Sequence, residues 1–326
     1  MARELAKLGG RELARSGFSQ LPSLIQRAGP RASWRFVEFF AANIRNKNTR
    51  AAYAQAVGQF FRWCDRRRIV ELEQIRPVVI AAYIEEVMAA RSRPTTKQHL
   101  AAIRMLFDWL VTGQVVPMNP ASSVRGPKYV TKRGKTPVLK SDEARRLLDS
   151  IQTDSIVGLR DRALIGIMCY SFARVSAVVN MNIEDYFANG KRWWFRLHEK
   201  GGKRHEVPAH HNAESYLDAY IDAAGIWEEK KGPLFRSVDK RRKLTLAPLS
   251  RVDVWRMIRR RAKDAGIETA IGCHTWRATG ITAYLENHGT IENAQAIAAH
   301  ESPRTTKLYD RTSDEITLDE VERIAI

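Results

Sequence analysis

Six polar side chains in the second half of the chain are of types that could act together on a reaction centre that gains negative charge. They are two guanidiniums, two imidazoles, one amine and one phenol, at Arg174, Arg277, His274, His300, Lys200 and Tyr309. A guanidinium is a fixed cation with several donors, an imidazole exchanges protons near neutral pH, and a phenol is a nucleophile once it is deprotonated. This set could therefore stabilise an anion, move protons and attack an electrophilic centre.

Each of these residues also has an ordinary structural explanation when it is taken alone. Arg174 follows a predicted apolar helix at residues 159–173, where a cation interacts favourably with the helix dipole. Lys200 precedes two glycines and could be a solvated turn residue. His274 and Arg277 stand three apart on one face of a predicted helix, a spacing that chance often produces.

The order of the candidates along the chain is more specific than any one of them. Arg174 follows an apolar helix and Lys200 lies on a predicted glycine hairpin. Three further segments follow: His274-Thr275-Trp276-Arg277, Ala298-Ala299-His300 and Thr305-Thr306-Lys307-Leu308-Tyr309. This arrangement resembles the tyrosine recombinase (phage integrase) family. Asn48-Thr49-Arg50-Ala51-Ala52-Tyr53 is similar to the helix opening of that family's core-binding domain, so the resemblance covers about residues 33–326.

The resemblance implies that the chain breaks and rejoins DNA through a covalent tyrosine link, with no cofactor and no metal ion. Attack on a phosphodiester builds negative charge on its nonbridging oxygens, and Arg174, Arg277 and His300 would supply the donors there. Tyr309 would be the nucleophile, and by resemblance His274 is the base that takes its proton.

The leaving 5′ oxygen would depart as a poor alkoxide, so a positioned proton donor should matter. Lys200 matches the family's motif and is the candidate acid, while Lys203 and Arg204 lie close enough in sequence to remain alternatives. Tyr309 would become a 3′-phosphotyrosine, which retains the bond energy that lets a 5′ hydroxyl reverse the step without ATP.

The chain departs from the family's usual pattern at three places. Where an acidic residue usually stands three after the first arginine, this chain has Ala177, so the support for Arg174 must come from elsewhere. Phe172 and Ala173 replace the glycine and leucine that commonly precede that arginine, and Ala299 replaces the glycine before the second histidine. None of these departures removes a catalytic group, so the expectation of activity stands.

The elements that would position these residues follow from the hydrophobic pattern. Apolar residues at helical spacing predict four helices over residues 33–112, and a proline-rich basic stretch at 116–137 predicts an extended linker. Beyond the linker, Ser141 is the predicted N-cap of a helix, and a β-hairpin surrounds Lys200. Further helices are predicted at residues 159–173, 212–224, 251–265, 275–286, 291–299 and 318–324.

This pattern gives a mainly α fold class with two folded domains. We expect a flexible N-terminal arm at 1–30, a helical core-binding (SAM-like) DNA-binding domain at 31–115 and a basic linker at 116–137. A mixed α/β catalytic domain of the tyrosine recombinase type, with a small β-sheet and a C-terminal exchange helix, should occupy residues 138–326.

The charge of the chain favours a nucleic acid partner. The 326 residues carry 54 Lys+Arg against 36 Asp+Glu, a formal charge of +18, and residues 1–133 hold 23 Lys+Arg against 9 Asp+Glu. Such an excess attracts polyanions and suits phosphate contacts, so the N-terminal part should grip the DNA backbone. Cys64, Cys169 and Cys273 stand far apart, as in a protein of a reducing cytoplasm, and no apolar run is long enough for a membrane span or signal peptide.

The predicted function is site-specific recombination of double-stranded DNA in the bacterial cytoplasm, at the nucleoid. The resemblance implies a homotetramer on two duplexes that exchanges C-terminal helices, and it leaves room for an accessory directionality protein. The thirty N-terminal residues are short for an arm-binding domain, so an integrase or resolvase of a mobile element with a simple site is favoured. A type IB DNA topoisomerase and a non-catalytic DNA-binding regulator on the same fold are the alternatives.

Overall fold

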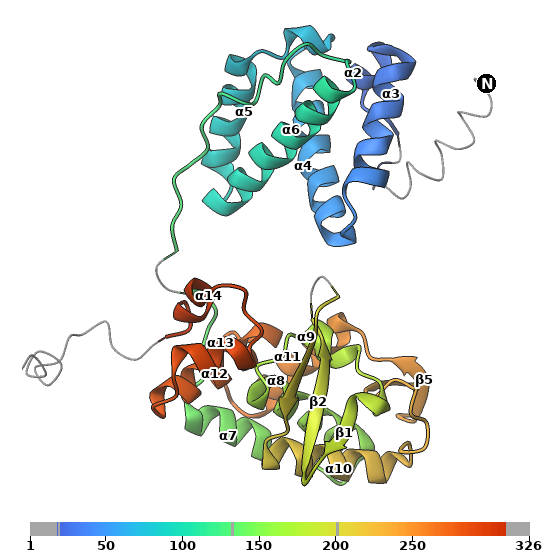
Figure 1. The fold of residues 1–326 in the computed structure, drawn as a ribbon, viewed down its shortest axis with the longest axis vertical. Helices are drawn as coiled ribbons and strands as arrows, with labels where there is room; N and C mark the ends of the chain where they lie inside the picture. Colours follow the sequence, from blue (N-terminus) through green and yellow to red (C-terminus); the bar gives the residue numbers. More distant parts are fainter. Residues whose placement is uncertain (1–17, 19, 132–133, 200–201, 311–326) are drawn as a thin grey trace, which may run out of the picture. The chain divides into compact units, whose positions relative to one another are not determined.

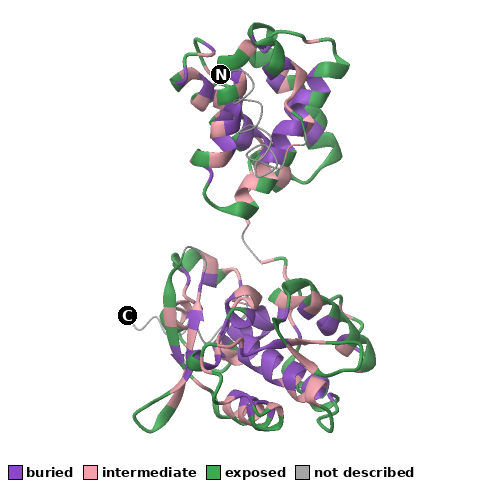
Figure 2. Cartoon of the chain, turned by 90° about the vertical axis from the view of Figure 1, so that its right-hand side faces the viewer, coloured by how far each residue is buried: buried purple, intermediate pink, exposed green. Residues whose placement is uncertain are grey.

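The chain divides into two compact units, residues 1–130 and 131–326 (Figure 1). The computed structural model describes residues 18, 20–131, 134–199 and 202–310. Each unit has its own buried hydrophobic core, which Figure 2 shows along the inward faces of the helices.

The first unit is built from helices. Its elements are α2 (Ser23–Arg27), α3 (Gly29–Glu38), a π-helical turn (Phe39–Asn43), α4 (Lys47–Arg66), a 3₁₀ turn (Leu72–Gln74), α5 (Pro77–Ala90) and α6 (Arg93–Thr112). The starts of the long helices follow from local chemistry, because Asn46 and Ser92 accept hydrogen bonds from the first turns of α4 and α6. The helices predicted for residues 33–112 are confirmed.

The first unit extends beyond its predicted limits at both ends. Leu24 and Ile25, within the expected arm, are buried in the core of this unit, so the arm does not reach residue 30. Val116, Ala121 and Val124, within the expected linker, are buried there too. Burying these apolar side chains in the core is more favourable than leaving them exposed on an extended segment. The neighbouring prolines and basic residues made both segments resemble an arm and a linker in the sequence.

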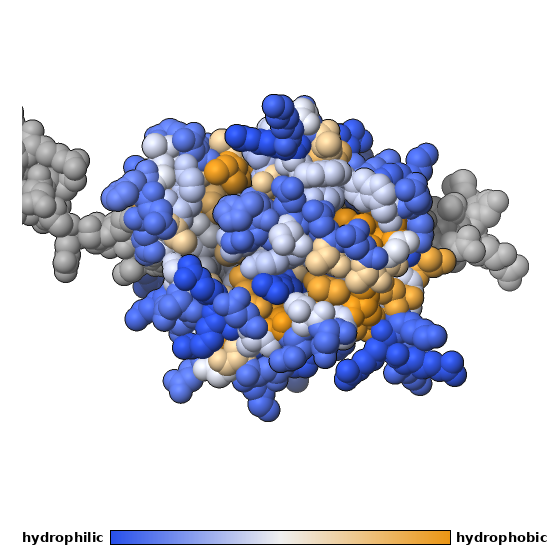
Figure 3. All heavy atoms as spheres, turned by 90° about the horizontal axis from the view of Figure 1, so that it is seen from below, coloured by the Kyte–Doolittle hydropathy of each residue, from blue (hydrophilic) through white to orange (hydrophobic). Residues whose placement is uncertain are grey.

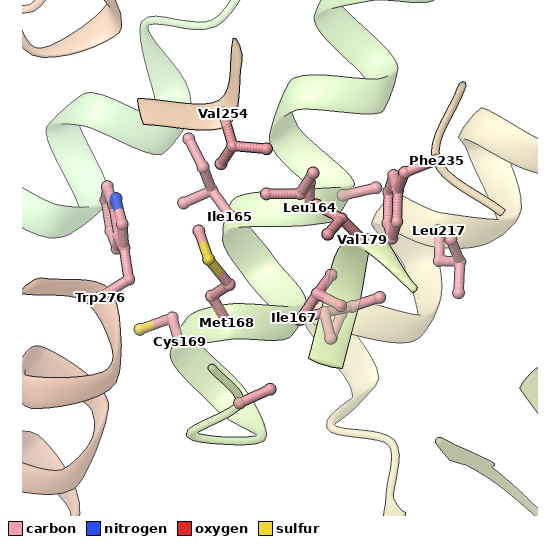
Figure 4. Close-up of a cluster of buried hydrophobic side chains, with 14 of the residues drawn as sticks. Leu164, Ile165, Ile167, Met168, Cys169, Val179, Leu217, Phe235, Val254 and Trp276 are labelled. Atoms are coloured by element: carbon pink, nitrogen blue, oxygen red, sulfur yellow. The ribbon is translucent and has the colours of Figure 1, made fainter. Parts of the chain in front are cut away.

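The second unit surrounds a central helix, α8. Its helices are α7 (Ser141–Asp149), α8 (Ile156–Tyr170), α9 (Val175–Val179), a 3₁₀ turn (Ile183–Asp185), α10 (His211–Ala224), α11 (Arg251–Asp264), α12 (Cys273–Glu286), α13 (Ile291–Ile297) and α14 (Pro303–Lys307). Helix α8 is buried over nearly its whole length and packs against α10 and α12. Figure 4 shows Leu164, Ile167 and Met168 of α8 in the core, with Trp276 of α12 on one side and Phe235 on the other.

Two small antiparallel sheets complete the second unit. Strands β1 (Tyr186–Asn189), β2 (Arg192–His198) and β3 (Arg204–Pro208) are joined in sequence order, and β4 (Arg236–Val238) pairs with β5 (Leu244–Pro248). In the β2–β3 hairpin His198 pairs with Arg204, so the predicted hairpin is present, while Lys200 itself lies outside the described residues. The sequence pattern did not indicate β1 or the second sheet.

Other boundaries differ from the prediction for local reasons. Helix α8 ends at Tyr170 because the chain turns at Phe172, so Arg174 caps the start of α9 and does not lie at the end of an apolar helix. The residue that caps α7 is Lys140, whose backbone N–H donates to the Glu143 carboxylate, so Ser141 is the first helical residue. The predicted exchange helix at residues 318–324 lies outside the described residues.

The surface carries only separate apolar patches on the face seen in Figure 3. Among the large exposed apolar side chains of the second unit are Leu246 on β5 and Val252 and Trp255 on α11. Within the described residues, no helix combines the length and the apolar character that a bilayer span requires.

Candidate active site

Helix α12 carries two of the candidate residues, His274 in its first turn and Arg277 three residues later. This helix lies very close to the end of α8, since a Cβ atom added at Gly280 would come within 2.0 Å of the Cys169 carbonyl oxygen. Only glycine allows that approach. The approach brings Arg277 to the loop that follows α8 and contains Arg174.

Arg277 is buried and held in place by backbone carbonyls. Its Nη1 donates to the Phe172 carbonyl, and its Nη2 donates to the Ala298 carbonyl at 2.6 Å. Its Nε is buried without a hydrogen-bond partner among the described residues. Burial and the nearby charge of Arg174 lower the pKa of Arg277 to about 10, which leaves it charged at neutral pH. A rigid cation with an unused donor is suited to receiving an anion.

Two backbone positions next to the site have positive φ although neither is a glycine. Phe172 has a φ of 52° and Ala299 a φ of 48°. A side chain in this conformation costs about 1 kcal/mol. The resemblance leads one to expect glycine at both positions, and glycine adopts a positive φ without a steric penalty. The two bends bring the Phe172 carbonyl to Arg277 and lead from α13 into His300.

Tyr309 lies just after α14 with its hydroxyl against His274. The distance from the hydroxyl oxygen to His274 Nε2 is 2.5 Å. The Thr282 hydroxyl of α12 donates to the Tyr309 carbonyl at 2.8 Å, and the Gly134 N–H donates to the Leu308 carbonyl at 2.9 Å. These contacts fix the backbone of the tyrosine segment, so that the phenol and the imidazole can exchange a proton directly.

His300 stacks on the Tyr309 ring. The two ring centroids are 5.7 Å apart and the planes differ by 6°. His300 Nδ1 lies 2.9 Å from the hydroxyl of buried Thr306. When that hydroxyl donates, His300 Nδ1 is the acceptor and Nε2 carries the proton, ready to donate to a ligand.

Both histidines are kept neutral by their surroundings. Burial lowers the pKa of His300 to about 3, and the charges of Arg277 and Arg174 act in the same direction. Burial, Arg277 and Arg174 also lower the pKa of His274 below its usual value. A neutral His274 can accept the Tyr309 proton at physiological pH.

Arg174 receives its support from a residue that the sequence did not single out. Its Nη1 donates to the carboxylate of Glu199, the residue directly after β2. Glu199 thereby fills the need left by Ala177, which is buried in the apolar core of the unit. Lys200 follows Glu199 and lies outside the described residues, while Lys203 accepts a backbone hydrogen bond from Glu199 N–H at 2.8 Å.

The structure thus brings Arg174, His274, Arg277 and His300 together near the phenol of Tyr309. Sequence reasoning missed Glu199 and gave no role to Thr306. A signal existed for Thr306, since it stands three residues before Tyr309 in a recognised segment. None existed for Glu199, whose contact with Arg174 spans 25 positions of sequence.

Comparisons with known proteins agree with this architecture. A family model described as "Phage integrase family" matches residues 137–315, and one described as "Phage integrase, N-terminal SAM-like domain" matches residues 35–114. The tyrosine recombinase XerC of Thermodesulfovibrio yellowstonii is 28% identical over 271 residues, which cover 81% of this chain and 85% of that protein. The tyrosine recombinase XerD of Chlorobaculum tepidum is 28% identical over 275 residues, 80% of this chain and 85% of that protein.

Solved structures share the fold. The XerH site-specific recombinase in its post-cleavage complex with a palindromic difH substrate aligns with a TM-score of 0.69 and 19% identity, over 98% of this chain and 95% of that chain. A lambda integrase dimer bound to a COC′ core site aligns with a TM-score of 0.66 and 19% identity, over 96% of this chain and 84% of that chain. The predicted fold class, a helical domain followed by a mixed catalytic domain with small sheets, is confirmed.

Proposed function

Because this chain belongs to the phage integrase family, we propose that it is a site-specific tyrosine recombinase that works through a 3′-phosphotyrosyl intermediate. The observation that carries the proposal is the 2.5 Å contact between the Tyr309 hydroxyl and His274 Nε2, beside His300 and Arg277. A phenol placed against a neutral base among cations is arranged to attack a phosphodiester.

In the first step His274 Nε2 takes the proton of Tyr309 as the phenolic oxygen attacks the scissile phosphorus. Negative charge that grows on the nonbridging oxygens is met by Arg174, by the unused Nε of Arg277 and by Nε2–H of His300. These donors are held before DNA arrives, so little reorganisation opposes the reaction.

In the same step the bond from phosphorus to the 5′ oxygen breaks. Lys200 donates a proton to that oxygen, which leaves as a hydroxyl, and the 3′ phosphate stays on Tyr309. Attack by a 5′ hydroxyl from another strand reverses these events, returns the proton to Tyr309 and joins the strands. The phosphoester energy is retained throughout, so the cycle needs neither ATP nor a metal ion.

The biological role we propose is that of an integrase or resolvase of a mobile element. The strongly basic residues 1–133 would grip the duplex while the second unit cleaves it. By analogy with the lambda integrase tetramer bound to a Holliday junction, four chains would assemble on two duplexes, with the C-terminal segment at residues 318–324 exchanged between neighbours. Such a protein would act at the nucleoid in the cytoplasm, with or without an accessory directionality protein.

A library of nicked duplexes incubated with the full chain in EDTA, without ATP, tests this proposal. We expect a covalent protein–DNA adduct on one sequence class and, with intact duplexes of that class, recombinant products. A strict Mg²⁺ requirement for cleavage would contradict the proposed chemistry. Relaxation of supercoiled DNA without any strand exchange would favour a type IB topoisomerase, and binding without an adduct would favour a non-catalytic regulator.

A further inference from the structure

Glu199 is a buried carboxylate that pairs with Arg174 and acts electrostatically on Arg277, the second arginine of the candidate site. Its side chain is 4% exposed, whereas that of its partner Arg174 is 33% exposed. The charge of Glu199 also raises the pKa of Arg277, while Arg174 lowers it. The carboxylate therefore offsets the repulsion between two guanidiniums that must both face one phosphate.

The place of Glu199 in the chain gives the contact a second consequence. Glu199 directly precedes Lys200, and its N–H closes the hairpin on the Lys203 carbonyl. On the neighbouring strand β3, His205 Nε2 lies 2.9 Å from the Ile297 carbonyl, one residue before the Ala298 carbonyl that accepts from Arg277. The hairpin is thus tied to the surroundings of both arginines, once through each strand.

From this geometry we propose that Glu199 is the positioning residue for Arg174, and that it ties this arginine to the β2–β3 hairpin. The inference rests on the proposed function. A guanidinium has five N–H donors, and Glu199 engages Nη1, which leaves others for a phosphate oxygen. The carboxylate therefore orients the guanidinium and leaves it able to bind the nonbridging oxygens.

The opposite arrangement would be a carboxylate that occupies the place of the phosphate and must be displaced. The exposures argue against it, because such a carboxylate would cover the open side of the guanidinium. Glu199 is nearly inaccessible while the Arg174 side chain is one-third exposed, so the contact with Glu199 does not close off the whole of the Arg174 side chain. The two arrangements predict opposite effects when the carboxylate is removed.

The test compares Glu199→Gln, which keeps the shape and removes the charge, with the matched control Glu206→Gln. Glu206 lies on the same hairpin and pairs with Arg196, but this pair is exposed. On a saturating nicked suicide duplex we expect Glu199→Gln to slow adduct formation about 10- to 100-fold, with DNA affinity and thermal unfolding close to wild type. Glu206→Gln should change the rate less than about twofold.

A double-mutant cycle with Arg174→Ala separates positioning from a general structural role. If Glu199 acts through Arg174, Glu199→Gln has almost no further effect on the cleavage rate in the Arg174→Ala background. An undiminished effect in that background would overturn the inference. A wild-type rate for both Glu199→Gln and Glu199→Ala, or a faster rate with tighter DNA binding, would also overturn it. A wild-type protein that forms no adduct would instead refute the proposed function.

Discussion

Acidification should destabilise the second unit through His300. This ring has a pKa of about 3 in the fold, because it is buried beside Arg277, Arg174 and His274, against about 6.5 in the unfolded chain. Below pH 6.5 the unfolded chain therefore binds a proton that the folded chain does not, and stability falls as the pH decreases towards the folded value. One pKa unit corresponds to about 1.4 kcal/mol, so the step from pH 7 to pH 5 should cost about 2 kcal/mol through this residue alone.

The assay is urea unfolding of the full chain at pH 7 and pH 5, with His300→Gln as the matched variant. Other titrating groups affect both proteins alike, so the difference between the two pH-dependent losses isolates His300. Wild type should lose about 2 kcal/mol more than His300→Gln between these pH values. Equal losses would refute the reasoning, since they would mean that His300 titrates normally in the fold.

Three further predictions test separate parts of the structure. Ala299→Gly should stabilise the protein by about 0.5–1 kcal/mol in urea unfolding, because φ is 48° at this position. The control Ala296→Gly, on α13, should destabilise the protein by a similar amount. A lower stability of Ala299→Gly would contradict the strain argument. Lys200→Ala should slow cleavage by about 10²–10⁴-fold, and a substrate with sulfur as the bridging leaving atom should restore most of the rate for this variant but not for Arg277→Ala; rescue of Lys203→Ala instead would move the acid to Lys203. A fragment of residues 134–326 should bind DNA with a shallower salt dependence, by about 0.9 in the logarithmic slope per lost phosphate contact, and equal slopes would show that the first unit does not grip the backbone.

The order of residues along the chain predicted much of the candidate site, because the required side chains stand in short recognisable segments. The predicted spacing of His274 and Arg277 on one helix and the hairpin around Lys200 are both present. Their catalytic roles stay predictions. Helical periodicity likewise predicted the long helices, whose apolar faces repeat clearly.

Features set by tertiary contacts could not be predicted from the sequence. The bend at Phe172 could not be recognised in the sequence, since a positive φ usually requires glycine. Because of this bend, Arg174 is the N-cap of α9 and does not lie at the end of the preceding helix, where it was predicted. The sequence around Glu199 indicates only a polar residue beside a turn. In the structure Glu199 is buried against Arg174, which lies 25 positions away in the sequence. The buried apolar residues at 116–124 were obscured by neighbouring prolines and basic residues.

The most direct test of the central claim is to map the covalent link on DNA-trapped protein. After digestion of the adduct, mass spectrometry should find the nucleotide remnant on the peptide that contains Tyr309, joined through a 3′ phosphate. The other strand end should carry a free 5′ hydroxyl that accepts a labelled phosphate, and Tyr309→Phe should bind the same site without forming an adduct. Linkage through a 5′ phosphate, linkage to another residue, or an undiminished adduct in Tyr309→Phe would contradict the account.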